Sequence, residues 1–114
     1  MTMSDCLFCK IVAGGIPADT VRETEDFLAF RDINPQAPTH VLAIPKYHIA
    51  SLNEAADARV LGELLLFARD VAKGEGLADD GYRVVLNTNA GAGQTVFHIH
   101  AHVLGGRPLR WPPG

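Results

Sequence analysis

Residues 98–106, HIHAHVLGG, decide how the rest of the chain is interpreted. His98, His100 and His102 alternate with apolar residues, and Val103 continues the alternation. A period of two predicts a β-strand, in which residues i, i+2 and i+4 lie on one face. We therefore expect three imidazoles in a row, with neighbouring rings about 6–7 Å apart. A metal-binding tract or a purification tag is the alternative interpretation, but a tag is usually a contiguous terminal run.

Four further strands and two helices are predicted to precede this stretch. Strands are expected at residues 20–24, 27–32, 39–44 and 82–87, a short helix at residues 6–12, and a long helix from residue 53 or 57 to residue 73. Ser4 or Asp5 is the expected cap of the short helix. Strands that follow one another as hairpins predict an α+β fold with a five-stranded, mainly antiparallel sheet in one domain, residues 1–114.

Two positions outside these strands suggest contacts with another surface. The long helix carries one broad apolar stripe that includes Leu64, Leu65 and Val71. Leu66 lies instead among polar positions, which indicates a partner subunit, although a singly exposed Leu is also common. Trp111 is the only Trp and stands in a proline-rich tail, so we expect its side chain to pack on something.

Composition excludes several classes of partner. The 114 residues carry a net charge of -3, so no basic field of the kind that nucleic-acid-binding proteins use is present. No apolar run approaches the length of a membrane span, and residues 1–5 contain no targeting signal. We therefore expect a cytoplasmic protein with small-molecule or protein partners and neither nucleic acid nor membrane.

Residues 87–95 form a glycine-rich loop that leads into the histidine stretch. Backbone N–H groups in such a turn can converge on an anion, and Gln94 and Thr95 add side-chain donors. Gly93, Gln94 and Thr95 are therefore a candidate phosphate cradle, although the loop alone is also typical of a simple hairpin turn. An imidazole beside it could act as acid or base, or attack phosphorus through a neutral ring nitrogen. A backbone carbonyl or His40 could hold the other ring N–H.

Two further polar residues lie near predicted strand ends, where small-molecule sites gather. Asp32 could accept hydrogen bonds from the two hydroxyls of a ribose, but it could equally cap a turn. His40 is either part of the site or a core histidine whose hydrogen bonds are satisfied. The sequence leaves both alternatives open.

A possible metal site involves the two cysteines. Cys6 and Cys9 are three residues apart, and two thiolates with two imidazoles make a tetrahedral zinc site. His48 and His98 are the candidates that would complete it. A pair of free buried cysteines is the alternative. A catalytic zinc held by the histidine triad is disfavoured, because three His and two Cys exceed the four ligands of such a site.

Several long motifs resemble the histidine triad nucleotide-binding family, and its Hint branch most closely. They lie at residues 30–40, 44–48, 93–95, 98–102 and 105–114, so the resemblance covers nearly the whole chain. It implies a homodimer in which two five-stranded sheets form one ten-stranded sheet. It also implies hydrolysis or transfer at the α-phosphate of purine nucleoside phosphoramidates, typically adenosine 5'-phosphoramidate to AMP, with no cofactor required. The alternative is a nucleotide-binding or partner-docking module with residual activity.

The resemblance assigns a role to each matching residue. His100 would be the nucleophile that forms a nucleotidyl-histidine, His102 would hold phosphate oxygens, and His40 would support His100. Asp32 would bind the ribose. The phosphate and leaving group would meet Asn87, Gly93, Gln94 and Thr95; the base pocket would contain Phe8, Ile11, Ile33 and Leu42; and Trp111 would reach the partner's site.

Two departures from the family pattern concern Thr95 and the cysteines. Thr95 stands where many Hint members carry Ser, so the hydroxyl remains but a methyl group is added. Cys6 and Cys9 are present in bacterial relatives, some of which bind zinc through two Cys and two His that match the four residues named above. The resemblance therefore implies a structural zinc and a structural role for His98.

Overall fold

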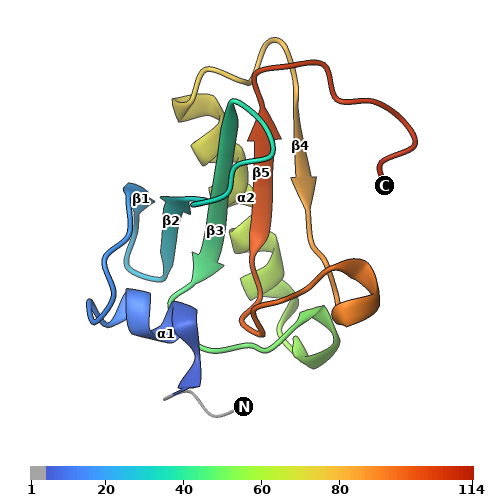
Figure 1. Cartoon of the computed structure of the whole chain (residues 1–114). Helices are drawn as coiled ribbons and strands as arrows, with labels where there is room; N and C mark the ends of the chain where they lie inside the picture. The colour runs from blue at the N-terminus through green and yellow to red at the C-terminus, as the bar shows by residue number, and fades with distance from the viewer. Residues whose placement is uncertain (1–4) are drawn as a thin grey trace.

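Five antiparallel strands form one sheet in the computed structural model, which describes residues 5–114 (Figure 1). Their spatial order is β1-β2-β3-β5-β4. The bounds are Thr20–Glu23 (β1), Phe27–Arg31 (β2), Thr39–Pro45 (β3), Tyr82–Val85 (β4) and Ala101–Gly105 (β5). The predicted five-stranded antiparallel sheet is therefore confirmed, with each strand near its expected place.

Helix α1 covers Leu7–Val12 and helix α2 covers Ala58–Gly74. The Asp57 side chain accepts a hydrogen bond from the Arg59 N–H, which fixes the start of α2 at the later of the two expected positions. Cys6 caps α1, since its Sγ accepts from the Cys9 N–H at 3.3 Å. The expectation of an Asp5 cap was therefore wrong, and Ser4 lies outside the described residues. Short 3-10 turns occur at Leu52–Glu54 and Ala90–Ala92.

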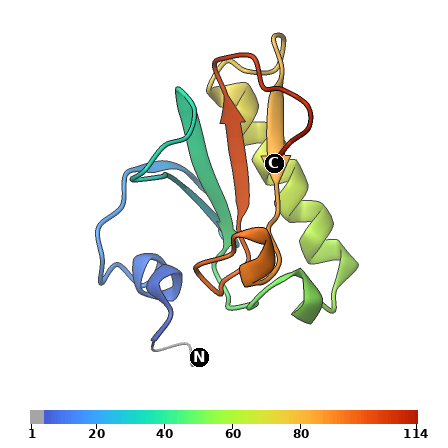
Figure 2. The same ribbon diagram turned by 45° about the vertical axis from the view of Figure 1, so that its right-hand side comes forward.

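The sheet has a different cover on each face (Figures 1 and 2). Alternate residues of β2 point to opposite sides: Phe27 packs with α2, whereas Phe30 packs with α1. Each buried side chain of this size contributes about 1.5–3 kcal/mol. The α2 side holds the larger core, and the α1 side holds a smaller group made of Cys6, Phe8, Leu28, Phe30, Leu42 and Ile44.

The histidine stretch is only partly a strand. β5 begins at Ala101, paired with Ala43, so His98 and His100 precede it in irregular backbone. Continuation of the ladder would bring Pro45 opposite Ile99, and proline has no N–H to donate. The Ile99 N–H donates to the Ile49 carbonyl at 2.6 Å instead. The expectation of three imidazoles aligned on one strand was therefore wrong.

Several apolar side chains are exposed in this single chain. Leu65 and Leu66 on α2 are 48% and 51% exposed. The expectation that Leu65 belongs to the buried stripe was therefore wrong. Trp111 is 81% exposed and belongs to neither core cluster of residues 5–114. In the sheet that the described residues form, β4 lies at the edge with one side unpaired. Within residues 5–114, no helix is both long enough and apolar enough to cross a membrane.

Candidate active site

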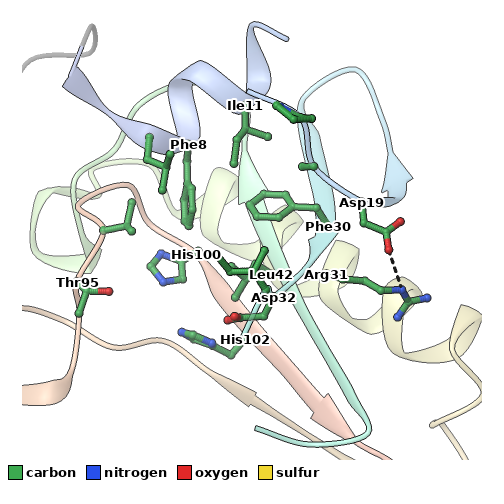
Figure 3. A pocket seen from close by; sticks show the side chains of 15 residues that line it. Phe8, Ile11, Asp19, Phe30, Arg31, Asp32, Leu42, Thr95, His100 and His102 are labelled. Atoms are coloured by element: carbon green, nitrogen blue, oxygen red, sulfur yellow. Dashed lines mark ion pairs between the residues drawn. The ribbon is translucent and has the colours of Figure 1, made fainter. Parts of the chain in front are cut away.

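A cavity of about 550 Å³ lies on the α1 side of the sheet (Figure 3). Its size is within the range of small-molecule sites. One part is apolar, and its walls come from α1, β2, β3 and the residue after Thr95: Leu7, Phe8, Ile11, Phe30, Leu42 and Val96. The other part is polar and is lined by Asp32, Thr95, His100 and His102. The cavity can therefore hold a flat apolar group beside a polar one.

The predicted pocket residues Phe8, Ile11, Ile33 and Leu42 all line this cavity. Phe30 was missed, although a signal existed: it is the β2 residue paired with Leu42 in an antiparallel hairpin. Other lining residues that the sequence did not indicate are Leu7, Pro17, Ala18, Asp19, Arg31 and Val96. Asp19 and Arg31 form an ion pair of 3.7 Å at the rim (Figure 3).

His100 lies buried where the polar and apolar parts meet, with the Phe8 ring edge-on to it at 5.1 Å between centroids. Its Nδ1 is 2.7 Å from the His98 carbonyl oxygen. A carbonyl only accepts, so Nδ1 carries the proton and Nε2 keeps a lone pair. Burial lowers the pKa of His100, against the raising effects of that hydrogen bond and of Asp32. The ring is therefore neutral at pH 7, with one basic nitrogen.

His102 takes its tautomer from His40. The Gln36 N–H donates to His40 Nδ1 at 3.0 Å, so Nε2 of His40 carries the ring proton. That Nε2–H donates to His102 Nδ1 at 2.8 Å, which leaves His102 with its proton on Nε2. Burial, followed by repulsion from His100 and His40, lowers the pKa of His102 to about 4. His40 was expected to support His100, but the residue it contacts is His102.

Asp32 caps a turn, as one of its two expected roles requires, and it also lines the cavity. Its Oδ1 accepts from the Asn34 N–H at 2.8 Å and so caps the turn after β2. Its Oδ2 is 3.4 Å from His40 Nε2, and the side chain also lines the cavity. One carboxylate oxygen thus holds the loop while the other faces the imidazoles.

The glycine-rich loop offers fewer free donors than expected. The N–H groups of Gly93 and Gln94 donate to Ala90 and Asn89 carbonyls within the loop. The buried Gln94 side chain is also used, because Nε2 donates to the carbonyls of Ala50 (2.8 Å) and Val96 (3.2 Å) and Oε1 accepts from the Asn89 N–H (2.7 Å). The cradle expected at residues 93–95 therefore reduces to Thr95.

Three other predicted site residues lie outside the cavity lining: Asn87, Gly93 and Trp111. Gly93 has φ of +95°, a conformation that glycine adopts without strain, and it turns the loop toward Thr95. Asn87 follows β4, and its Nδ2 lies beside Gly93. The side chain of Trp111 is directed into solvent in this single chain.

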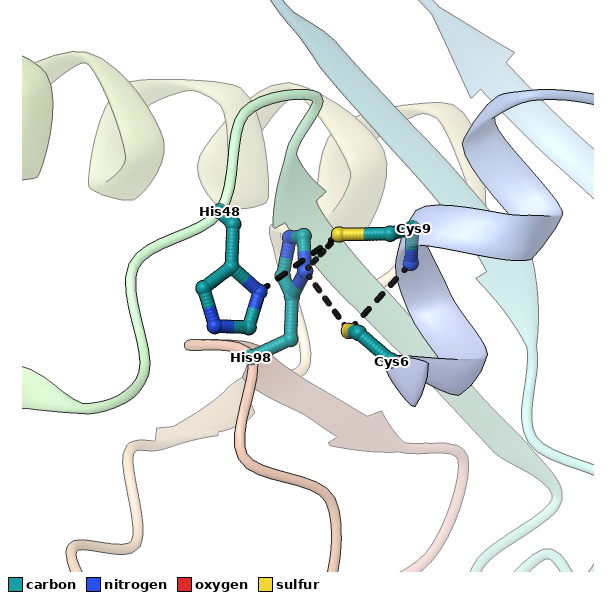
Figure 4. A group of neighbouring side chains, drawn as sticks. All are labelled: Cys6, Cys9, His48 and His98. Carbon is teal, nitrogen blue, oxygen red and sulfur yellow. Dashed lines mark hydrogen bonds between the residues drawn. The ribbon is translucent and has the colours of Figure 1, made fainter. Parts of the chain in front are cut away.

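A second group of side chains, the Cys₂His₂ cluster, consists of Cys6, Cys9, His48 and His98 (Figure 4). Its four potential ligand atoms lie within 4.8 Å of one another. His98 Nδ1 is 3.3 Å from Cys6 Sγ and 3.5 Å from Cys9 Sγ, and His48 Nδ1 is 3.4 Å from Cys9 Sγ. In a tetrahedral zinc site, bonds of about 2.3 Å to sulfur and 2.0 Å to nitrogen separate the two atoms by about 3.5 Å.

The chemistry of the donor atoms also fits a cation. His98 Nε2 lies 2.8 Å from the Pro45 carbonyl and donates to it, so the lone pair is on Nδ1 and faces both sulfurs. Burial lowers the pKa of His98 to about 4, which keeps the ring neutral. Burial, together with a hydrogen bond and charge from Cys6, raises the pKa of Cys9 to about 11. A bound divalent cation would reverse that effect by stabilising the thiolate.

A family model for the HIT domain matches residues 13–109. The chain belongs to the HIT family. Two relatives support the assignment over nearly the whole length. A purine nucleoside phosphoramidase from Escherichia coli K12 is 48% identical over 107 residues, covering 92% of this chain and 90% of the relative. A 14 kDa zinc-binding protein from Zea mays is 52% identical over 115 residues, covering 97% and 89%.

A solved HIT structure has the same fold. The HIT family hydrolase from Legionella pneumophila Philadelphia 1 superposes with a TM-score of 0.94 at 55% identity, covering 96% of this chain and 100% of that chain. The resemblance to the histidine triad family is thereby confirmed. Within this HIT protein the three histidines have separate places: His100 and His102 line the cavity, and His98 lies in the Cys₂His₂ cluster.

Proposed function

We propose that this protein hydrolyses purine nucleoside 5'-phosphoramidates, with adenosine 5'-phosphoramidate giving AMP, through a nucleotidyl-histidine on His100. The observation that carries the proposal is the tautomer of His100: Nδ1–H is held by a backbone carbonyl, so the unprotonated Nε2 is the nucleophile of a ring that lines the cavity. The E. coli relative, named a purine nucleoside phosphoramidase, supports the substrate class.

The reaction has two displacements at the α-phosphorus. In the first, the Nε2 lone pair of His100 bonds to phosphorus while the P–N bond breaks, and the leaving amine takes up a proton from the solvent. In the second, a water oxygen bonds to phosphorus, the bond to Nε2 breaks, and the water returns a proton to the solvent as AMP forms. The His98 carbonyl holds Nδ1–H in both steps and stabilises the positive charge that the ring carries in the intermediate.

The other cavity residues bind and orient the substrate. His102 Nε2–H donates to a phosphate oxygen, and His40 keeps that proton on Nε2. Asp32 accepts from the ribose hydroxyls, and the apolar walls formed by Phe8 and Leu42 enclose the purine. Thr95 lies on the leaving-group side of the phosphate.

Replacement of the nucleophile tests the proposal. His100→Asn should lower turnover by three or more orders of magnitude, because the covalent route is lost. AMP should still bind, since the walls and Asp32 remain. Mass spectrometry of acid-quenched wild-type protein mixed with the phosphoramidate should find one nucleotidyl adduct, located on His100. Hydrolysis that persists in His100→Asn, or an adduct on another residue, would contradict the assignment.

We also propose a structural zinc in the Cys₂His₂ cluster and assembly as a homodimer. The cluster geometry supports the metal, and the name of the maize relative agrees with it. No step above uses the ion, which would tie α1 to the loop at His48 and to residue 98. The unpaired side of β4 and the exposed Leu65 and Leu66 support pairing of two sheets into one of ten strands.

A further inference from the structure

Helix α1 contributes residues to both the cavity and the Cys₂His₂ cluster. Cys6 and Cys9, at its start and in its first turns, belong to the Cys₂His₂ cluster, whereas Leu7, Phe8 and Ile11 line the cavity. Residues of the cluster and residues of the cavity wall therefore alternate along α1 and the cap that precedes it. A movement of α1 that changes the cluster also changes the wall of the cavity.

A helix of this length does not hold its own position. Isolated helices shorter than about 12–15 residues are marginal in water. α1 is fixed by tertiary contacts, which are the burial of Cys6 and Phe8 against β2 and β3 and the contacts of the two thiols with His48 and His98. An ion in the cluster would add bonds from α1 to two distant segments of the chain.

Phe8 and His98 carry the connection further, to the reacting ring. The Phe8 ring meets Phe30, His98 and His100 edge-on, at centroid distances of 5.3, 6.0 and 5.1 Å. His98 presents its ring to the thiols and its carbonyl oxygen to His100 Nδ1. The same residue thus faces the cluster with its side chain and the nucleophile with its backbone.

We infer that occupancy of the Cys₂His₂ cluster by zinc and binding of a purine nucleotide in the cavity are positively coupled through α1 and Phe8. The inference rests on the proposed function for the identity of the nucleotide. Zinc fixes α1, so the wall of the cavity is already ordered when the nucleotide arrives. By thermodynamic reciprocity, the nucleotide must raise zinc affinity by the same factor. Cys6, Cys9 and His48 are in this sense positioning residues for the nucleotide.

Two titrations measure the coupling from its two sides. Calorimetry with AMP should give a dissociation constant about 5- to 20-fold weaker in chelated protein than in zinc-loaded protein. Competition for zinc against a chromophoric chelator should show the same factor when AMP is saturating. Far-UV circular dichroism of the chelated protein should be unchanged outside a small loss of helix signal. In steady-state assays, KM should rise more than kcat falls.

Variants on α1 separate the coupling from simple stability. Phe8→Leu keeps the four ligands, so zinc should still bind while the two coupling factors drop below about twofold. Lys10→Ala on the exposed side of α1 is the matched control and should keep the full factor. Cys6→Ser/Cys9→Ser should bind AMP like chelated wild type, whether or not zinc is added.

Three outcomes would overturn the inference. AMP affinity could be equal with and without zinc, Phe8→Leu could retain the full coupling, or chelation could unfold the whole chain, which would make zinc a requirement of the fold and not a tether of α1. Failure of the proposed function gives a different result: either AMP does not bind even to the zinc-loaded protein, or AMP binds with the full coupling while no adduct forms on His100.

Discussion

At the scale of residues, hydrogen bonds to backbone groups decide what each histidine can do. The His98 carbonyl accepts a hydrogen bond from His100 Nδ1, so this nitrogen carries the ring proton, whereas the Gln36 N–H donates to His40 Nδ1, so that nitrogen is unprotonated. His102 then takes the opposite tautomer to His100, since its Nδ1 accepts. The neighbouring rings of His100 and His102 therefore present a lone pair and a proton respectively, which suits one to attack phosphorus and the other to hold its oxygens.

The low pKa of His102 makes stability depend on pH. The folded pKa of about 4 lies below the ordinary value of 6.5, so the unfolded chain binds more protons between these values. Stability from the neutral ring is complete above pH 6.5 and is lost as pH falls toward 4. His102→Gln should reduce this slope by at most about 1.4 kcal/mol per pH unit.

Urea unfolding of wild type and His102→Gln at pH 7, 5.5 and 4.5 measures the effect of this residue. The two proteins should converge in stability as the pH falls. Parallel curves over this range would show that His102 does not bind a proton on unfolding. Lys73→Gln on the exposed side of α2 is a control that should leave the slope in this range unchanged within about 0.5 kcal/mol per pH unit.

At the scale of elements, the loop before the histidines is built to hold its own shape. The buried Gln94 side chain makes three hydrogen bonds with backbone groups of Ala50, Asn89 and Val96, so its replacement removes the partner of each group. Gln94→Leu, of similar volume, should destabilise the protein by about 2–3 kcal/mol. Chemical denaturation measures this, with the exposed Gln36→Leu as a control expected to change stability by less than about 0.5 kcal/mol. Equal stability of the two variants would show that the Gln94 hydrogen bonds do not stabilise the loop.

The Cys₂His₂ cluster gives a prediction about metal content. Protein purified from zinc-replete cells should contain about one zinc per chain by elemental analysis, as four ligands form one tetrahedral site. Cys6→Ser/Cys9→Ser should contain none and should melt at a lower temperature, because a bound ion stabilises the folded state that holds it. Lys10→Ala should keep its zinc. A metal-free wild type of equal thermal stability would count against the site.

At the scale of the whole molecule, one face of the sheet holds the larger core and the other holds the candidate functional sites. α2 covers one face of the sheet and α1 lies on the other (Figure 2). The α2 face holds the larger core, whereas the α1 face carries the cavity and the Cys₂His₂ cluster. The open edge at β4 and the exposed Leu65, Leu66 and Trp111 lie outside both. An unpaired edge strand and exposed apolar side chains are both features that a second copy of the chain could cover.

Oligomeric state tests this surface. Sedimentation equilibrium should give a dimer for the wild type and a shift toward monomer for Leu66→Glu, because a charge would be buried without a partner. Leu52→Glu, at another exposed leucine, is the matched control and should remain dimeric. A monomeric wild type would contradict the ten-stranded sheet.

The C-terminal tail is tested by truncation. Truncation before Arg107 removes Trp111 and should alter kinetics with adenosine and guanosine substrates. Unchanged kinetics after truncation would contradict a role for the tail.

Local patterns in the sequence were sufficient for the elements and for the histidine and cysteine candidates, whereas the base-pocket residues were predicted from the resemblance to the family. Alternation and apolar stripes depend on neighbours within a few positions, so the five strands and α2 could be predicted. The spacing of Cys6 and Cys9 and the motif at residues 98–102 carried the chemistry in the same way. These features need no knowledge of which distant segments pair.

Only the tertiary structure decided which partner each of those residues meets. His40 bonds His102 across 62 residues because β3 and β5 pair with Leu42 opposite His102, which leaves His40 on the diagonal. His98 turns to the cysteines because Pro45 cannot extend the ladder. Donor groups of the glycine-rich loop are consumed by backbone carbonyls that its fold brings near. Hydrogen-bond partners are properties of register and packing, which a local pattern does not contain.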